Sequence, residues 1–205
     1  MISTQNSPVR IVAILLAAGE GRRIGGPKAL LPIQGRSFLA HLDAALAGCA
    51  IDEVIVVLGH EAERVGREAG LAGSARTVVN AAYRDGMLGS ILCGLDAAAG
   101  AAAALVHPVD HPLVAVETIG RVADALRAGA LIAVPSLDGQ RGHPGGFAAS
   151  VWPELRNAPP ERGARAVLAA HTDWIVHVPG DPGCLAGIDT PADYERWIGP
   201  WPAER

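Results

Sequence analysis

One stretch near the start of the chain decides the fold: residues 9–28, which read VRIVAILLAAGEGRRIGGPK. The first part, Val9–Leu16, is a continuous apolar run rich in branched side chains, typical of a parallel strand buried on both faces. The second part, Ala17–Lys28, is a glycine-rich, basic loop. In parallel sheets ligands bind beyond the carboxyl ends of the strands, so this order predicts a ligand site at the loop.

Length and composition set the limits of the remaining interpretation. A chain of 205 residues is expected to form one domain, residues 1–205, with a flexible polar start at residues 1–8. Half of the residues are hydrophobic and 19% are charged, which excludes a disordered chain. The formal net charge of −4 argues against a nucleic-acid partner, because such binding needs a basic surface that displaces counterions.

Cysteine usage and the apolar runs predict the cellular compartment of the protein. The three cysteines Cys49, Cys93 and Cys184 are odd in number and widely spaced, which indicates a reducing compartment, so we expect a cytoplasmic protein. The apolar run at 11–18 is too short and too poorly flanked for a signal peptide. The alanine-rich run at 97–106 is too short to span a bilayer, so we expect no membrane partner.

Short apolar runs alternate with helical patterns along the whole chain. Strands are expected at 9–16, 53–58, 76–79, 103–107, 131–134 and 175–178, and Asp138-Gly139 signals a hairpin. Helices are expected at 38–47, 61–69, 88–98, 115–128 and 164–170, with a short one after Thr190-Pro191. This alternation predicts an α/β fold, a Rossmann-like three-layer α/β/α arrangement with a mostly parallel sheet.

The chemistry of the glycine-rich loop points to a polyanionic ligand. Arg22, Arg23 and Lys28 place three positive charges among small residues whose backbone amides can form an anion nest. A nucleoside triphosphate is the simplest ligand of this kind. An exposed glycine-rich turn with solvated arginines is the alternative.

Two common phosphate-binding motifs do not fit this loop. The dinucleotide pattern G-x-G-x-x-G requires glycine where Ile24 stands. The P-loop pattern is interrupted by Pro27, and Ala29 replaces the hydroxyl residue that would reach magnesium. The loop therefore matches neither of these phosphate-binding motifs.

The spacing L-A-A-G-x-G-x-R-x-G-x-x-K does fit, through Leu16, Ala17, Ala18, Gly19, Gly21, Arg23, Gly25 and Lys28. It resembles the signature of the molybdenum-cofactor nucleotidyltransferases, most of all the CTP:molybdopterin cytidylyltransferases, which have a glycosyltransferase-A-like fold. The resemblance implies that Arg23 and Lys28 neutralise the triphosphate as catalytic groups. The implied nucleotide-binding residues of the loop are Leu16, Ala17, Ala18, Gly19, Gly21 and Arg22. Alanine at Ala18 is found in cytidylyl members, so CTP is favoured over GTP.

Asp110 is the first candidate metal ligand. It stands in the string His107–Pro112, HPVDHP, directly after the predicted strand 103–107, and two prolines fix its backbone. A rigid carboxylate beside a triphosphate suits Mg²⁺, which takes one or two carboxylates plus phosphates. The alternative is an aspartate that bonds its own backbone in a turn. The P-x-D-x-P string resembles the family's metal motif, which implies that Asp110 holds catalytic Mg²⁺, with Mn²⁺ as an alternative ion.

Asp189 is the second candidate ligand. It lies in GIDTP, residues 187–191, which resembles the family's D-I-D-T-P segment except that Gly187 replaces the first aspartate. The resemblance implies a second metal ligand. The alternative is an N-cap or turn residue before the helix that starts at Pro191.

Further segments resemble the parts of the family that hold the base and the acceptor. The stretch 79–94, VNAAYRDGMLGSILCG, resembles N-x₅-G-M-x-x-S and implies that Asn80, Met87 and Ser90 lie near the nucleotide base and ribose. We expect Gly59, at the end of a predicted strand, to lie there too. The R-G-H-P segment at 141–144 implies that His143 lines the acceptor side, and we expect His111 beside it.

Together these features predict a Mg²⁺-dependent enzyme that moves CMP from CTP to a phosphorylated small acceptor and releases pyrophosphate. The resemblance implies a pterin acceptor, molybdopterin or molybdenum cofactor, and a molybdoenzyme as client. The alternatives are a guanylyltransferase that uses GTP and a sugar- or polyol-phosphate nucleotidyltransferase of the same fold. A non-catalytic nucleotide-binding cofactor chaperone is the alternative from a different functional class.

Overall fold

The computed structural model describes residues 9–73 and 75–202, so the expected flexibility of residues 1–8 lies outside the described residues. The strands are β1 (Ile11–Ala17), β2 (Pro32–Ile33), β3 (Arg36–Ser37), β4 (Glu53–Leu58), β5 (Arg76–Val79), β6 (Ala103–Pro108), β7 (Ile132–Leu137), β8 (Gln140–Arg141), β9 (Gly145–Ala148) and β10 (Ile175–Pro179). The α-helices are α1 (Phe38–Ala47), α2 (Ala62–Glu68), α3 (Met87–Ala97), α4 (Val116–Arg127), α5 (Trp152–Arg156), α6 (Ala164–Ala170) and α7 (Pro191–Trp197). Short 3₁₀ helices include η1 (Arg22–Ile24), η2 (Lys28–Leu30) and η3 (Tyr83–Asp85).

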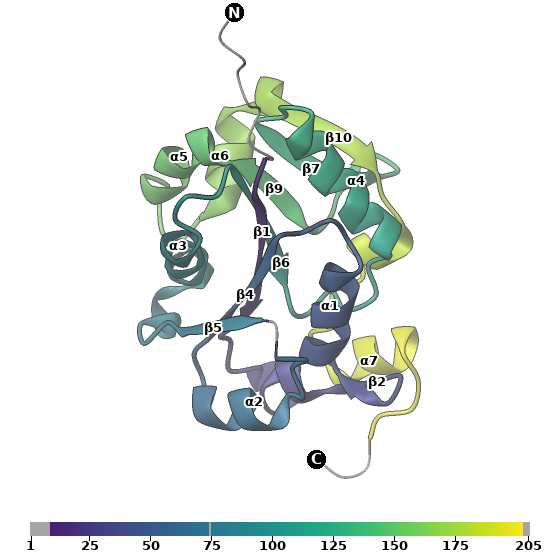
Figure 1. The fold of residues 1–205 in the computed structure, drawn as a ribbon. Coiled ribbons are helices and arrows are strands. Elements are labelled where there is room, and N and C mark those ends of the chain that lie inside the picture. The colour runs from purple at the N-terminus through teal and green to yellow at the C-terminus, as the bar shows by residue number, and fades with distance from the viewer. Residues whose placement is uncertain (1–8, 74, 203–205) are drawn as a thin grey trace, which may run out of the picture.

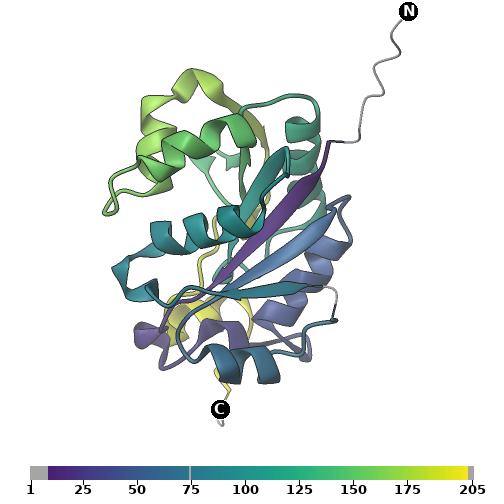
Figure 2. The ribbon, with the colours of Figure 1, turned by 60° about the vertical axis from the view of Figure 1, so that its left-hand side comes forward.

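Eight of the strands build one twisted sheet with helices on both faces (Figures 1 and 2), and β2 and β3 pair in a separate two-stranded sheet. The order of the large sheet is β10–β7–β9–β6–β1–β4–β5, and β8 pairs with β7 in a hairpin. β1 lies in the middle, parallel to both β4 and β6. The predicted three-layer α/β/α fold with a mostly parallel sheet is therefore confirmed, and so is the hairpin at Asp138-Gly139.

β9 is the main departure from the sequence prediction. It runs antiparallel between β6 and β7, where the sequence indicated only a glycine-rich segment. Glycine has low strand propensity, which concealed this strand. A Cβ atom added at Gly146 would come within 2.9 Å of the Val122 and Leu126 side chains of α4. The glycine therefore lets α4 approach the sheet closely. The small β2–β3 hairpin and α5 were also not expected.

The core lies in two layers that share the sheet. Every residue of β1 is buried, and alternate side chains point to opposite faces. Ile11, Ala13 and Leu15 pack in the layer formed with α1, α2, α4 and α7. The even-numbered residues of β1 pack in the layer formed with α3, α5 and α6. The apolar run that opens the sequence is thus buried on both faces, as its composition predicts.

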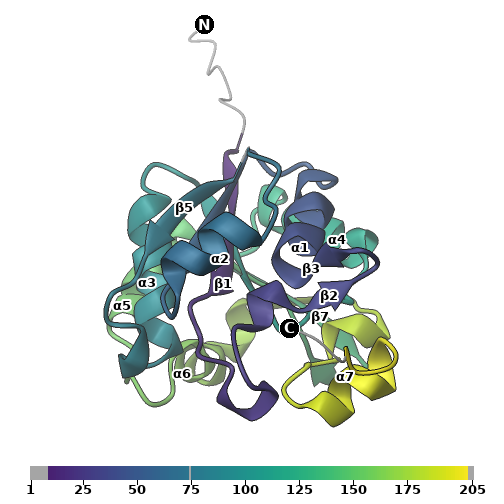
Figure 3. The same ribbon diagram turned by 90° about the horizontal axis from the view of Figure 1, so that it is seen from below.

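The parallel strands bring their carboxyl ends to one edge of the sheet. In the register, Leu16 of β1 pairs with Pro108 of β6, and Ala17 pairs with Leu58 of β4. The glycine-rich loop, the HPVDHP turn and the turn after β4 consequently start side by side. Figure 3 views the molecule from this edge, with α7 close to the loop.

No helix formed by residues 9–73 and 75–202 has the length and apolarity needed to cross a bilayer.

Two helical glycines provide a test of this packing. A Cβ atom added at Gly94 in α3 would lie 2.3 Å from Cγ2 of Ile14 on β1, whereas one added at Gly120 in α4 would meet nothing within 4 Å. We expect Gly94→Ala to lower the free energy of unfolding by about 1–3 kcal/mol through overpacking. The matched change Gly120→Ala should raise it by about 0.5–1 kcal/mol, because alanine favours a helix. Urea denaturation measures both, and equal effects would contradict the close α3–β1 packing.

Candidate active site

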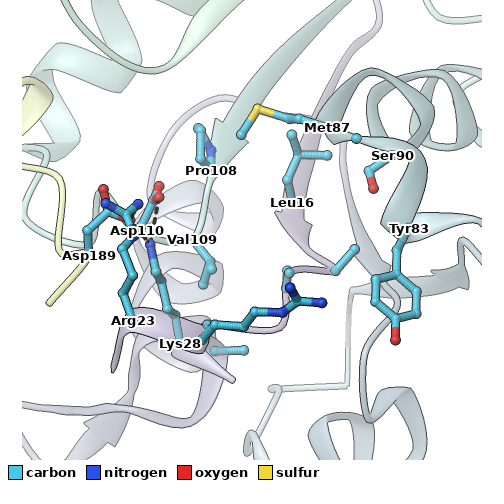
Figure 4. A pocket seen from close by; sticks show the side chains of 17 residues that line it. Leu16, Arg23, Lys28, Tyr83, Met87, Ser90, Pro108, Val109, Asp110 and Asp189 are labelled. Carbon is cyan, nitrogen blue, oxygen red and sulfur yellow. Dashed lines mark hydrogen bonds and ion pairs between the residues drawn. The ribbon is translucent and has the colours of Figure 1, made fainter. Parts of the chain in front are cut away.

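A cavity of about 480 Å³ opens beyond the carboxyl ends of β1 and β6 (Figure 4). This volume is typical of a small-molecule site. Most of the residues predicted from the sequence to form the site line it, namely Leu16, Ala17, Ala18, Gly19, Gly21, Arg22, Arg23, Lys28, Met87, Ser90, Asp110 and Asp189. The structure therefore brings together segments that are far apart in the sequence.

The glycine-rich loop owes its shape to bonds around Gly21. The backbone carbonyl of Gly21 accepts hydrogen bonds from the amides of Ile24 (3.0 Å) and Gly26 (3.1 Å). Gly21 has φ +62°, and a Cβ atom there would lie 1.9 Å from the Gly26 carbonyl oxygen, so only glycine fits. The Ile24 side chain is buried and anchors the loop in the core. A Cβ atom added at Gly19 would meet nothing within 4 Å, which leaves open space for a ligand.

One end of the cavity holds an ionic cluster of two carboxylates and two cations. Lys28 Nζ lies 3.0 Å from Asp110 Oδ2 and 2.5 Å from Asp189 Oδ1. Arg23 Nη2 lies 2.9 Å from the same Asp189 oxygen. Figure 4 shows these four side chains converging from the loop, from the turn after β6 and from the segment before α7. Their formal charges sum to zero.

Lys28 is the sole lysine in the sequence. Its side chain is 15% exposed, less than those of the carboxylates it contacts. A lysine presents a compact point charge, in contrast to the planar fork of an arginine. Lys28 is thus the one ammonium side chain of the protein, and it lies between the two candidate metal ligands.

The structure rejects the turn interpretations of the two aspartates. Thr190, not Asp189, caps α7, through a capping box with Asp193. Partial burial raises the pKa of Asp189, but the hydrogen bond and charge of Lys28, together with Arg23, outweigh it and lower the pKa overall. The Asp110 carboxylate bonds Lys28 and not its own turn. Both carboxylates therefore face the cavity, where Lys28 is their partner.

The residues present fit a hard divalent cation. Asp110 Oδ1 is buried, and among the described residues it has no hydrogen-bond partner, so one acceptor position of the carboxylate is unused. Mg²⁺ and Mn²⁺ are bound by carboxylate oxygens, usually one or two, together with substrate phosphates. In the part of the chain that the structure describes, no group of three or more His, Cys, Asp or Glu side chains is arranged to hold a metal. A cation at this site would therefore need ligands from a substrate.

The charge balance of the cluster yields a prediction about metal affinity. A divalent cation at Asp110 and Asp189 would be repelled by the nearby ammonium of Lys28. We expect Lys28→Met, which keeps the length of the side chain without its charge, to bind Mn²⁺ at least ~10-fold more tightly than wild type in the absence of nucleotide. Electron paramagnetic resonance of free Mn²⁺ measures this. Arg67→Met, at an exposed pair with Glu68 on α2, is the control and should match wild type. Equal Mn²⁺ affinity of wild type and Lys28→Met would contradict the competition.

The other end of the cavity is lined mainly by apolar and aromatic side chains, with one serine. Leu16, Met87, Ser90 and Tyr83 lie there, on the side away from the carboxylates (Figure 4). Met87 is 58% exposed, although it is a large apolar side chain, as expected at the rim of a binding site. Tyr83 was not predicted from the sequence. The available signal was an aromatic residue inside a stretch already assigned to the nucleotide, in a chain that has two tyrosines.

Gly59 and Asn80, which we expected near the nucleotide base, are not among the described residues that line the cavity, and both lie directly behind its wall. The Asn80 side chain is buried, donates to Ser90 Oγ (3.0 Å) and accepts from the Ala82 amide (3.0 Å). A Cβ atom at Gly59 would lie 2.7 Å from Tyr83 Cβ and 2.8 Å from Ala18 Cβ. Both residues support the lining residues. Their positions near the strand ends were predicted, but their orientation was not.

His111 and His143 form a pair beside Asp110, and neither is among the residues that line the cavity. Their ring centroids are 4.5 Å apart, and His111 Nε2 lies 3.9 Å from Asp110 Oδ1. Burial, reinforced by the neighbouring His111, lowers the pKa of His143 to about 4. Burial likewise lowers the pKa of His111. Both rings are therefore neutral at pH 7, where each can donate one hydrogen bond and accept another.

The lowered pKa of His143 makes the stability of the protein depend on pH. Below its ordinary pKa of about 6.5 the unfolded chain takes up a proton that the folded protein takes up only near pH 4, so the free energy of unfolding falls as the pH falls between these values. We expect His143→Gln, which has no such group, to lose less stability over this range. Urea denaturation at pH 8, 6 and 5 measures this, with the pH 8 values as the reference. Parallel losses in both proteins would contradict the buried neutral ring.

The fold and the cavity define the class of protein as a nucleotidyltransferase. Its glycine-rich loop lies at the carboxyl edge of a mostly parallel sheet, where a nucleotide would bind. Comparison with known families agrees, because the profile of the MobA-like NTP transferase domain matches residues 13–175. The chain belongs to the MobA-like NTP transferase family. The matched range runs from β1 into the start of β10 and includes the loop and Asp110, whereas Asp189 lies beyond it.

Similar proteins have several named activities. The chain is 37% identical over 177 residues to nicotine blue oxidoreductase of Paenarthrobacter nicotinovorans, which covers 81% of this chain and 84% of that protein. It is 40% identical over 134 residues to 2-C-methyl-D-erythritol 4-phosphate cytidylyltransferase of Cereibacter sphaeroides, which covers 62% of this chain and 59% of the relative. It spans only 28% of the bifunctional protein GlmU of Rhodopseudomonas palustris, with 36% identity over 126 residues.

The fold is also close to that of solved structures. Rv0371c from Mycobacterium tuberculosis H37Rv superposes with a TM-score of 0.80 and 26% identity, over 93% of this chain and 98% of that one. A second structure of Rv0371c, in complex with manganese, superposes with a TM-score of 0.74 over 92% of this chain and 98% of that one. A divalent metal is therefore found with a structural relative of this chain.

Proposed function

We propose that the protein is a Mg²⁺-dependent cytidylyltransferase that moves CMP from CTP to a phosphorylated small acceptor, with molybdopterin as the acceptor that its motifs favour. The observation that carries this proposal is the contact of Lys28, from the glycine-rich loop, with both Asp110 and Asp189 at one end of the cavity. It places cations for a triphosphate beside carboxylates for a metal. Ala18 in the cavity wall and the cytidylyltransferase relative support CTP as the nucleotide.

In the proposed reaction an oxygen of the acceptor phosphate attacks the α-phosphorus of CTP. The bond from that phosphorus to the bridging oxygen breaks, and pyrophosphate leaves. Arg22, Arg23 and Lys28 stabilise the negative charge that develops on the leaving group. The acceptor phosphate is largely ionised at neutral pH, so no general base is needed.

Lys28 links nucleotide binding to the carboxylates. The triphosphate replaces Asp110 and Asp189 as partner of the ammonium, which frees both carboxylates. Asp110 and Asp189 would hold Mg²⁺ when it is bound, and the ion would supply Lewis-acid stabilisation of the phosphate charge. The site residues described here are cations and carboxylates, so positioning and charge are the means of catalysis that this site offers.

The acceptor side is assigned to His111 and His143. These neutral rings are tilted against each other, with centroids 4.5 Å apart next to Asp110, and they offer aromatic surface and hydrogen-bonding nitrogens. Both suit a planar heterocycle such as a pterin. A molybdoenzyme is the proposed client that receives the product.

An alternative acceptor or nucleotide keeps the same chemistry. The relative from Cereibacter sphaeroides is named for 2-C-methyl-D-erythritol 4-phosphate, so a polyol phosphate is the second acceptor candidate. GTP is the second nucleotide candidate, because one methyl group at Ala18 is all that favours CTP. A nucleotide-binding chaperone would bind the nucleotide and release no pyrophosphate with any acceptor.

A redox reaction is a second candidate function, because the chain resembles nicotine blue oxidoreductase over 81% of its length. Cys49, Cys93 and Cys184 are free thiols, so among the described residues no disulfide can carry electrons. An external electron donor would be required. Accelerated reduction of nicotine blue by the protein with an added hydride donor would support this candidate, and no acceleration would remove it.

The experiment that tests the proposal compares wild type with Asp110→Asn. With CTP, Mg²⁺ and molybdopterin, we expect pyrophosphate release to fall by roughly 10²–10³-fold in the variant, as for loss of other groups that stabilise transition-state charge. Asp124→Asn, at an exposed pair with Arg127 on α4, is the matched control and should retain wild-type activity. Panels of CTP, GTP, ATP and UTP, and of molybdopterin and polyol phosphates, identify the substrates. Full activity of Asp110→Asn would contradict the proposed role of this carboxylate.

A further inference from the structure

Tyr83 is the sole aromatic side chain among the described residues that line the cavity. It comes from η3, the turn before α3, and lies on the opposite side of the cavity from Asp110 and Asp189 (Figure 4). Of the other lining residues on that side, Leu16 and Met87 are apolar, and Ser90 is polar. A ligand whose phosphates lie at Lys28 would therefore direct its other end toward an aromatic and apolar wall.

The Tyr83 ring is held from several directions. Its hydroxyl lies 3.3 Å from His60 Nδ1, and the two rings are tilted with centroids 5.9 Å apart. Its Cβ atom packs against Gly59, where any side chain would clash. The guanidinium of Arg84 lies over the ring, with Cζ 5.1 Å from the centroid, in a cation–π arrangement. These contacts restrict the positions that the ring can take.

Glu20 connects this turn to the glycine-rich loop. One oxygen of its carboxylate accepts from Arg84 Nε (2.9 Å), and the other accepts from Arg22 Nε. The hydrogen bonds from Arg22 and Arg84 lower the pKa of Glu20 to about 2, so the links persist at neutral pH. Both arginines contact Glu20 through Nε. A single carboxylate thus fixes a cavity-lining cation and, through Arg84, the aromatic ring.

We propose that Tyr83 is the residue on which the base of the bound nucleotide packs, and that Glu20 acts through Arg84 as the positioning residue for its ring. The inference rests on the proposed function, because it takes the phosphates to lie at the Arg23–Lys28 end. Aromatic stacking accepts every base, so Tyr83 contributes affinity and leaves the choice between CTP and GTP to other lining residues.

Two probes separate the base contact from the phosphate contact: CTP, and inorganic tripolyphosphate, which has no base. We expect Tyr83→Ala to weaken CTP binding at least ~10-fold and to leave tripolyphosphate binding unchanged. Tyr83→Phe keeps the ring and should bind CTP within ~3-fold of wild type. Isothermal titration calorimetry with Mg²⁺ measures the affinities of wild type and both variants.

The role of the Glu20–Arg84 link is tested by Arg84→Met, which removes the guanidinium and keeps an unbranched side chain. We expect CTP binding to weaken by ~3–10-fold with tripolyphosphate binding unchanged, and the KM for CTP to rise with kcat unchanged. Arg162→Met, at an exposed arginine before α6, is the matched control and should behave as wild type. Wild-type CTP affinity in Arg84→Met would overturn the positioning role of Glu20.

Three further results would overturn the Tyr83 assignment. One is unchanged CTP binding in Tyr83→Ala, and another is an equal loss of CTP and tripolyphosphate, which would show that the variant damages the whole site. The third is a wild-type protein that binds tripolyphosphate but no nucleoside triphosphate, which would end the proposed function as well. If CTP binds through Tyr83 but no acceptor yields pyrophosphate, the base contact stands and only the proposed transfer fails.

Discussion

The contact of Lys28 with Asp110 and Asp189 is the interaction on which the site depends. The two carboxylates follow Lys28 by 82 and 161 residues and come from separate segments of the fold. Partly buried carboxylates that converge without a cation would repel one another. The ammonium therefore does in the free protein what a metal and substrate would do during the reaction, and the loop, the turn after β6 and the start of α7 are held in place by the same charge. A parallel sheet makes this convergence feasible, because its strands end at one edge.

Local chemistry explains how much of this could be predicted from the sequence. The apolar run of β1, the glycine-rich loop and the proline-flanked Asp110 each have a pattern that dictates their conformation, and the register of the sheet then places them together. β9 escaped prediction because Gly145 and Gly146 give no strand signal, and Gly146 is needed for the close approach of α4. Sequence spacing predicted that Asn80 and Gly59 lie near the site, but which way a residue faces is decided by packing. Glu20 and Tyr83 were missed for a related reason, since they meet through Arg84 across a separation of more than sixty residues.

The two ends of the cavity differ in how far they constrain the substrate. Charges at Arg23, Lys28 and the carboxylates require a polyanion and a compensating cation, whatever the nucleoside is. The opposite wall has few polar side chains, so it offers a ligand shape and apolar contact more than hydrogen bonds. His111 and His143 are not among the described residues that line the cavity, and the proposed function assigns the acceptor to them. Relatives of this chain have names as different as a cytidylyltransferase and an oxidoreductase.

The solitary lysine has a consequence for how the protein can be studied and altered. All other basic side chains besides the histidines are arginines, so the surface cations are guanidinium groups that do not react with acylating reagents at neutral pH. The one side-chain amine is the partly buried Nζ of Lys28, which lies between the carboxylates of Asp110 and Asp189. Covalent labelling of side-chain amines would therefore report on a single atom, and the rate of labelling would measure how often that ammonium leaves its carboxylate partners. Protection of that nitrogen by a ligand could be read directly, without any assay of turnover.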